Sequence, residues 1–145
     1  MKFIFFLLLS IIVGCSLKSI ANNVNEEEGL VFGTGGGFTG AVSYYKLLKN
    51  GNLYRSGNTD NSLILIGTLS TSVTNQMFDS YKVLNIDGVN LNDPGNRYYF
   101  IEKINKNNAH HKVTWGHAPL EHKSLAIFHD VLMNNVKTLN KKNNS

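Results

Sequence analysis

The residues best suited to chemistry in this chain are five histidines within a span of twenty residues: His110, His111, His117, His122 and His129. Imidazole nitrogens bind zinc, and His111, His117 and His122 are the set that a fold could gather around one ion. Against this, His122 and His129 lie two helical turns apart, roughly 10 Å along the axis, and no carboxylate or thiol completes an obvious set. We therefore expect no metal and no cofactor. A histidine-based metal-binding or enzymatic module stays the alternative.

Residue patterns that are typical of a catalytic nucleophile or an acid–base pair are missing from the sequence. No serine stands in the context of a nucleophile elbow, and His129 and Asp130 are neighbours whose side chains diverge on a helix. Asp87 and Asp93 each belong to a turn-forming dipeptide, Asp-Gly and Asp-Pro, which explains them without chemistry. We expect the protein not to be an enzyme.

The one cysteine, Cys15, closes an N-terminal segment with the layout of a secretory signal peptide. Lys2 precedes an apolar run from Phe3 to Val13, which is short for a membrane span, and small residues follow at Gly14 and Cys15. A single cysteine forms no intramolecular disulfide. We expect this segment to be a secretory signal peptide.

The four residues Ile12-Val13-Gly14-Cys15 resemble a bacterial lipobox, with isoleucine where leucine is usual. The resemblance implies that residues 1–14 are a signal peptide that is cleaved before Cys15, which becomes the first residue of the mature chain. It also implies attachment of acyl chains, such as palmitate, to this residue. Each buried methylene contributes about 0.8 kcal/mol, so more than one chain would anchor the protein stably. Ser16 in place of aspartate resembles lipoproteins passed on to the outer membrane. The implied location is the outer membrane, facing the periplasm rather than the cell surface.

Length and charge fit one small domain on a tether. Residues 15–28 form the lipidated cysteine and a polar tether, 29–139 a single domain, and 140–145 a polar tail. The 14 basic residues exceed the 10 acidic residues, for a formal net charge of +4. Arg55 and Arg97 are the only arginines, so nucleic acid is not expected as a partner.

Strands are predicted on both sides of Asn50-Gly51, a dipeptide that favours a tight hairpin turn. A continuous apolar run after this hairpin predicts a buried strand. Two further strand segments closer to the C-terminus predict a second hairpin. The predicted strands are 39–48, 53–56, 63–68, 97–104 and 111–115.

Two helices complete the predicted fold. Ser72 is positioned to cap the first, in which Val73, Met77 and Tyr81 recur every four residues. Pro119 suits the first turn of the second helix. The second helix carries an apolar stripe at helical spacing. An α+β fold follows, with a small antiparallel sheet packed by two helices. The stripe consists of Leu125, Phe128, Leu132, Val136 and Leu139.

Aromatic residues are predicted on both faces of the sheet. Tyr44-Tyr45 and Tyr98-Tyr99 are adjacent pairs, so each pair places one ring on each face of its strand. Trp115 alternates with Thr114 and is expected in the core. A sheet face that the helices leave uncovered would carry two of these tyrosines and could bind a partner.

The stretch FGTGGGFTG, residues 32–40, contains five glycines. Gly35-x-Gly37-x-x-Gly40 matches a dinucleotide-binding pattern, but the pattern requires a following helix, and a strand is predicted there instead. Two other interpretations stay open. The glycines form a bend in which two backbones approach closely, or they hold Phe38 outward as an apolar anchor in a binding loop.

The segment Gly36-Gly37-Phe38-Thr39-Gly40, followed by the predicted order of strands and helices, resembles emfourin-type proteins, which inhibit thermolysin-like metalloproteases. GGGFTG also occurs in small uncharacterised lipoproteins of Bacteroidetes-type bacteria, which this chain resembles as a whole. The resemblances imply a membrane-anchored, non-catalytic lipoprotein that binds another envelope protein, as an accessory subunit or a protease inhibitor. The expected partner-binding residues are Gly35, Gly36, Gly37, Phe38 and Thr39.

Overall fold

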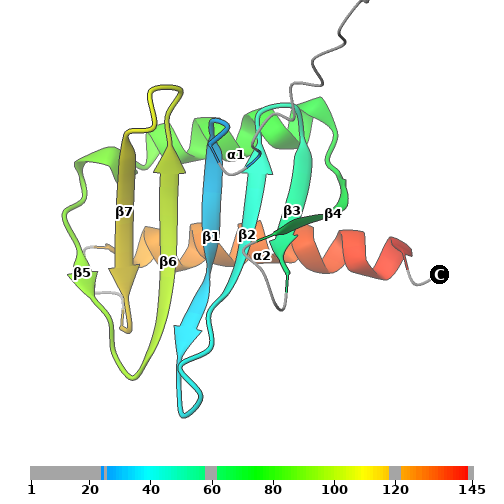
Figure 1. Ribbon diagram of the computed structural model, residues 1–145. Helices are drawn as coiled ribbons and strands as arrows, with labels where there is room; N and C mark the ends of the chain where they lie inside the picture. Colours follow the sequence, from blue (N-terminus) through cyan, green and yellow to red (C-terminus); the bar gives the residue numbers. More distant parts are fainter. Residues whose placement is uncertain (1–23, 25, 58–61, 118–121, 144–145) are drawn as a thin grey trace, which may run out of the picture.

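The computed structural model describes residues 24, 26–57, 62–117 and 122–143 (Figure 1). Within them the chain forms one seven-stranded sheet and two α-helices, which is the predicted α+β fold. The strands are β1 (Gly29–Gly36), β2 (Ser43–Leu48), β3 (Asn52–Ser56), β4 (Leu63–Thr68), β5 (Asn92–Asp93), β6 (Arg97–Ile104) and β7 (His110–Trp115). The helices are α1 (Thr71–Val83) and α2 (Lys123–Asn143), and a short 3₁₀ turn, η1, covers Ile86–Gly88.

The strand order in the sheet is β4-β3-β2-β1-β6-β7-β5, and all pairs are antiparallel except β5 with β7. The β2–β3 hairpin around Asn50-Gly51 and the β6–β7 hairpin confirm the two predicted hairpins. The first strand of the β2–β3 hairpin begins at Ser43, later than the predicted Thr39, because residues 37–42 form a loop. The central strand β1 was not predicted, since its four glycines weaken the usual strand signal.

The residue that caps the N-terminus of α1 lies earlier in the chain than the predicted one. The hydroxyl of Ser70, not Ser72, accepts a hydrogen bond from the amide of Val73 at 3.3 Å, and Ser70 has the extended backbone that a cap requires. Met77 and Tyr81 are buried as predicted, and Val73 is only half-buried because Thr74 takes the inward position. The Ser72 prediction was wrong because two serines stand close enough to compete for the same role.

The helix α2 presents the predicted apolar stripe to the sheet. Leu125, Phe128, Leu132 and Val136 are buried, and the half-buried Leu139 packs against the same core. Pro119, the predicted first-turn residue, lies outside the described residues. No helix among the described residues is both long enough and apolar enough to span a bilayer.

Both helices lie against one face of the sheet, and no helix of the described residues covers the opposite face (Figure 1). Every buried residue of the main core lies between Leu30 and Val136, and a chain that begins at Ser16 contains all of them. Trp115 is in this core, as predicted. Tyr45 and Tyr99 pack on the helix side, while their neighbours Tyr44 and Tyr98 pack against a small second cluster on the uncovered face.

The two edges of the sheet are both shortened or distorted. On one side β5 has only two residues and Pro94 follows it. On the other side β4 is shifted by a bulge opposite Leu53 and Tyr54. The prediction of a buried strand was correct in its bounds and wrong in its burial, because β4 is an edge strand whose Ile64 and Leu65 are exposed.

Candidate functional site

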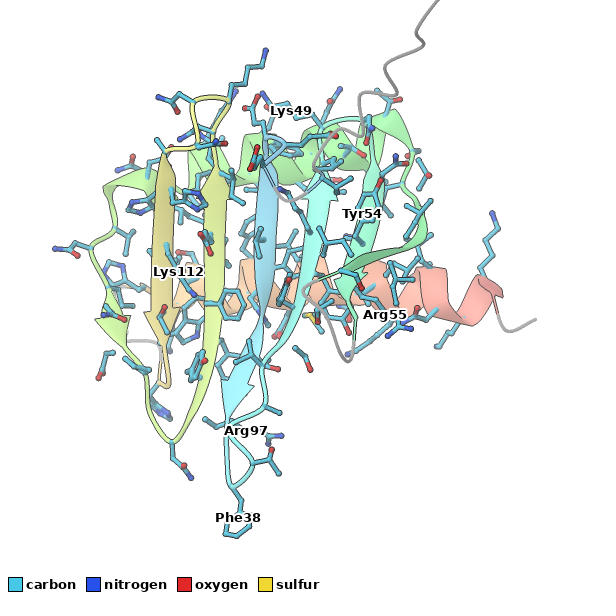
Figure 2. All side chains as sticks on the ribbon, in the orientation of Figure 1. Phe38, Lys49, Tyr54, Arg55, Arg97 and Lys112 are labelled. Carbon is cyan, nitrogen blue, oxygen red and sulfur yellow. The ribbon has the colours of Figure 1, made fainter. Side chains whose placement is uncertain are left out.

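The β1–β2 loop, residues 37–42, extends beyond the ends of the neighbouring strands. Phe38 occupies its tip, with a side chain that is completely exposed (Figure 2). Thr39, Gly40, Ala41 and Val42 are exposed as well. The loop therefore presents an aromatic ring to solvent on a segment without close packing partners at its tip.

Glycine is required in this loop by the backbone conformation. Gly36, Gly37 and Gly40 have φ angles of +87°, +77° and +62°, which favour glycine over any residue with a side chain. The amide of Gly37 donates to the carbonyl of Asn96 at 2.6 Å, and the amide of Gly40 donates to the carbonyl of Gly37 at 3.1 Å. The base of the loop is thus held by the segment before β6, and its tip by an internal turn.

Glycine is required in the adjoining part of β1 for a different reason, the close approach of other atoms. A Cβ atom on Gly33 would overlap the carbonyl oxygen of Ser43, and one on Gly35 would overlap the ring of Tyr98. At Gly37 and Gly40 a Cβ atom would meet nothing within 4 Å. The two open interpretations of the glycine-rich stretch therefore apply to different residues. The glycines within β1 allow a close approach of other atoms, and the glycines after β1 form an exposed turn.

The dinucleotide-binding pattern lacks its structural context. The residues after Gly40 lead into the strand β2, so no helix begins where a pyrophosphate would need its N-terminus. The five predicted partner-binding residues, Gly35 to Thr39, run from the end of β1 into the exposed tip, and the structure places them together on one hairpin.

The histidines do not converge. Nδ1 of His110 lies 2.6 Å from a carboxylate oxygen of Glu102, and Nε2 of His111 donates to the carbonyl of Ile86 at 2.9 Å. His117 is exposed and His122 is half-buried. Among the described residues, which include His111, His117 and His122, no group of three potential metal ligands is close enough to hold an ion.

His129 is buried between the sheet and α2 and has a structural role. Its Nε2 donates to the carbonyl of Gly33 at 2.9 Å, and its ring meets the rings of Tyr99 and Trp115 edge-on, with centroids 5.4 and 5.8 Å away. Burial lowers the pKa of His129, although the bond to Gly33 and the charge of Asp130 act in the opposite direction. The neutral imidazole therefore joins α2 to β1 close to the candidate loop.

Asp87, in the Asp-Gly turn, also has structural partners. Its carboxylate accepts a hydrogen bond from the hydroxyl of Tyr81 at 2.8 Å and one from the ammonium group of Lys103 at 3.2 Å. Partial burial alone would raise the pKa of Asp87, but these two bonds lower it overall. Burial raises the pKa of Tyr81 strongly, and the hydrogen bond to the Asp87 carboxylate and its negative charge act in the same direction. This cluster fastens η1 to α1 and β6, and its geometry explains Asp87 without catalysis.

No protein-family model and no curated protein matches the chain. The lipobox resemblance and the emfourin-type resemblance both stay predictions, and Cys15 lies outside the described residues.

Sequence reasoning missed one charged residue of interest, Lys46 on β2. Only 1 % of its side chain is exposed, although it lies on the face of the sheet opposite the helices. The alternation of Lys46 with the core residues Tyr45 and Leu47 was the available signal. This alternation predicts that Lys46 lies on the uncovered face. It does not predict that the side chain is buried there.

Proposed function

We propose that this protein is a membrane-anchored, non-catalytic lipoprotein whose α+β domain binds another envelope protein through the β1–β2 loop. Cys15 carries the lipid, and the outer membrane, on its periplasmic side, is the proposed location. The partner is an envelope complex to which this chain is an accessory subunit, or an envelope protease that it inhibits.

The exposed ring of Phe38 is the observation that carries this proposal. A phenylalanine with no contacts contributes nothing to the stability of its own domain, and burying such a ring in a partner gives roughly 2–3 kcal/mol. Aromatic residues are also typical anchors of protein interfaces. The glycine-rich backbone lets the tip adapt to a pocket, while the bond from Gly37 to Asn96 holds its base in place.

The position of the loop relative to the tether supports a protein partner. The tether joins the domain at Gly29, where β1 begins, and the loop follows Gly36, where β1 ends. Eight extended residues cover roughly 25 Å, so Gly29, where the domain begins, and the loop lie at opposite ends of β1 (Figure 1). A loop at the far end can reach a protein while the near end stays close to the lipid.

The sheet edges offer a weaker route to binding. A partner strand needs a regular edge to add to a sheet, and both edges here are blunted, by the short β5 and by the bulge at β4. The loop is therefore favoured over strand addition as the contact.

The test compares Phe38→Ser with Val83→Ser in the full-length, tagged chain, isolated from its native membranes after mild crosslinking. Val83 is an exposed apolar residue at the end of α1, so its replacement is the matched control. We expect the crosslinked partner to be lost with Phe38→Ser and retained with Val83→Ser. Equal capture by both variants would refute the loop as the contact.

A further inference from the structure

A hollow of about 310 Å³ lies between the first part of α2 and the helix-facing side of β6 and β7. Tyr99 of β6 and Trp115 of β7 are directly opposite in the register, so their side chains lie on the same face of the sheet. On α2, Ala126, His129 and Asp130 have the spacing that puts three side chains on one side of a helix. The hollow is therefore bounded by two strands and one helix, which pass one another in Figure 1.

Two nearly buried polar groups line this hollow without a hydrogen-bond partner among the described residues. They are the indole N–H of Trp115 and Nδ1 of His129, whose residues are only 2 % and 3 % exposed. The other ring nitrogen of His129, Nε2, already donates to the carbonyl of Gly33. No side-chain nitrogen or oxygen of the described residues is both unpaired and sealed from solvent, so these two atoms open to solvent where their residues line the hollow. Unpaired polar groups at such buried residues indicate a place for a ligand.

The groups of the hollow offer a hydrogen-bond donor beside an acceptor. The indole of Trp115 only donates, while Nδ1 of His129 accepts, because the proton of this neutral ring is on Nε2. The two ring centroids are 5.8 Å apart, so donor and acceptor are neighbours. Asp130, exposed and without an ion pair among the described residues, adds a carboxylate that only accepts. A ligand that fits must therefore both donate and accept at neighbouring positions.

This arrangement favours hydroxyl groups over charged groups as ligands. A carboxylate or phosphate would meet the negative charge of Asp130, the one permanent charge at neutral pH among the described lining residues. An ammonium group only donates, so it would leave the indole N–H of Trp115 unpaired. A hydroxyl group does both, and neighbouring hydroxyls can reach a donor and an acceptor together.

The remaining features of the hollow fit a sugar ring. Tyr99 is half-buried at its wall and offers an aromatic surface to the C–H face of a pyranose. The volume is close to the lower end of ligand pockets, about 300 Å³, which suits one sugar unit rather than several.

We propose that this hollow binds a single sugar unit, whose neighbouring hydroxyl groups bond to Trp115, His129 and Asp130 and whose ring lies against Tyr99. The site shares no residue with the β1–β2 loop and goes beyond the proposed partner binding.

The test uses the one tryptophan of the chain, Trp115, whose indole N–H gives a single cross-peak in ¹⁵N–¹H NMR. The full-length chain, in a zwitterionic detergent without a sugar head group, is titrated with the methyl glycosides of glucose, galactose, mannose and N-acetylglucosamine. We expect at least one glycoside to shift this cross-peak saturably, with a Kd on the order of 1 mM.

Three control compounds separate the ligand classes. Tetrahydropyran-2-methanol has the ring with one hydroxyl, acetamide has a neutral donor and acceptor, and acetate has the negative charge. Each should bind at least about tenfold more weakly than the best glycoside. The proposal is overturned if a control compound binds as tightly as that glycoside, or if no glycoside moves the indole cross-peak at up to about 50 mM.

Two variants assign the binding to this hollow. Ala126→Leu places a larger side chain in it and should abolish the shift of the indole cross-peak, with the rest of the spectrum retained. Asp130→Ala should weaken glycoside binding about tenfold. Asp79→Ala, which also removes an exposed carboxylate from a helix, is the matched control and should bind like the parent chain.

The variants also give outcomes that contradict the site. Glycoside binding by a folded Ala126→Leu variant with the affinity of the parent chain would overturn the proposal. If Ala126→Leu does not fold, the comparison of the two aspartate variants decides. Equal affinities of Asp130→Ala and Asp79→Ala would show that the sugar does not bind in this hollow.

Discussion

Nε2 of His129 donates a hydrogen bond to the carbonyl oxygen of Gly33, 96 residues earlier in the chain, at 2.9 Å. The bond joins the first third of α2 to the central strand, four residues before the first residue of the β1–β2 loop. It satisfies a buried carbonyl and a buried imidazole at once, which matters because either group left unpaired would cost about 1–3 kcal/mol. The base of the loop is therefore held from the core side by α2.

Protonation of His129 should destabilise the fold in mild acid. Burial lowers its folded-state pKa below the ordinary value near 6.5, so the unfolded chain takes up a proton first as the pH falls. The contribution of this residue is complete above about pH 6.5 and is lost as the pH falls toward the folded-state pKa. Urea unfolding at a series of pH values should show this loss in the free energy of unfolding.

The control for this prediction is His129→Gln, whose side-chain amide can still donate to Gly33 but does not titrate. Other histidines and carboxylates also contribute to the acid dependence. The informative quantity is therefore the difference in the free energy of unfolding between the parent chain and His129→Gln. That difference should shrink below pH 6.5. A constant difference across the range would mean that the buried imidazole does not control the acid stability.

Gly33→Ala should destabilise the domain more than Gly37→Ala. The new methyl group at position 33 meets the backbone of Ser43, which cannot move aside easily, and overpacking of this kind costs about 1–3 kcal/mol. At position 37 the methyl group has open space and only the positive φ angle is unfavourable, by roughly 1–2 kcal/mol. Chemical denaturation of both variants gives the order. The opposite order would contradict the division of the glycines into packing and loop roles.

The Tyr81–Asp87 hydrogen bond should appear as a coupling energy. Tyr81→Phe removes the donor and Asp87→Ala the acceptor, and each should reduce the free energy of unfolding by about 1 kcal/mol. The double variant should lose less free energy of unfolding than the two single variants lose together, since both changes remove the same hydrogen bond. Strict additivity in the double-mutant cycle would show that the two side chains are not coupled.

Local signals in the sequence predicted most of the fold. Asn50-Gly51 predicted the β2–β3 hairpin, and the stripe from Leu125 to Val136 predicted α2, because a turn dipeptide and a helical period are visible in a short stretch. β1 was missed since its role depends on Ser43 and Tyr98, residues from other strands that approach its glycines. The burial of β4 was overestimated, because the residues of one strand do not show whether that strand lies in the middle or at the edge of the sheet.

The exposed loop was predicted, while the burial of Lys46 on the uncovered face was not. Phe38 stands out in the sequence because glycines surround it, and the structure confirms that it is exposed. Lys46 has no such local signal, because Glu102, which attracts its charge, is far away in the chain and comes near it only through the register of β2, β1 and β6.

Phe38→Ser should leave the stability of the domain unchanged within about 0.5 kcal/mol, because the ring has no packing partners to lose. Thermal unfolding of the variant beside the parent chain measures this directly. A larger loss would mean that the loop packs against the domain in solution, and the ring would then be part of the core rather than available to a partner.

The most direct test of the proposed function is photo-crosslinking in living cells with a benzophenone amino acid at position 38 of the full-length chain. The same amino acid at position 83 is the control, since both side chains are exposed. We predict one reproducible protein adduct from position 38, absent from position 83, that disappears when an unlabelled parent chain is co-expressed and persists when the co-expressed competitor carries Phe38→Ser. Adducts that are the same from both positions, or that both competitors remove equally, would contradict partner binding by the β1–β2 loop.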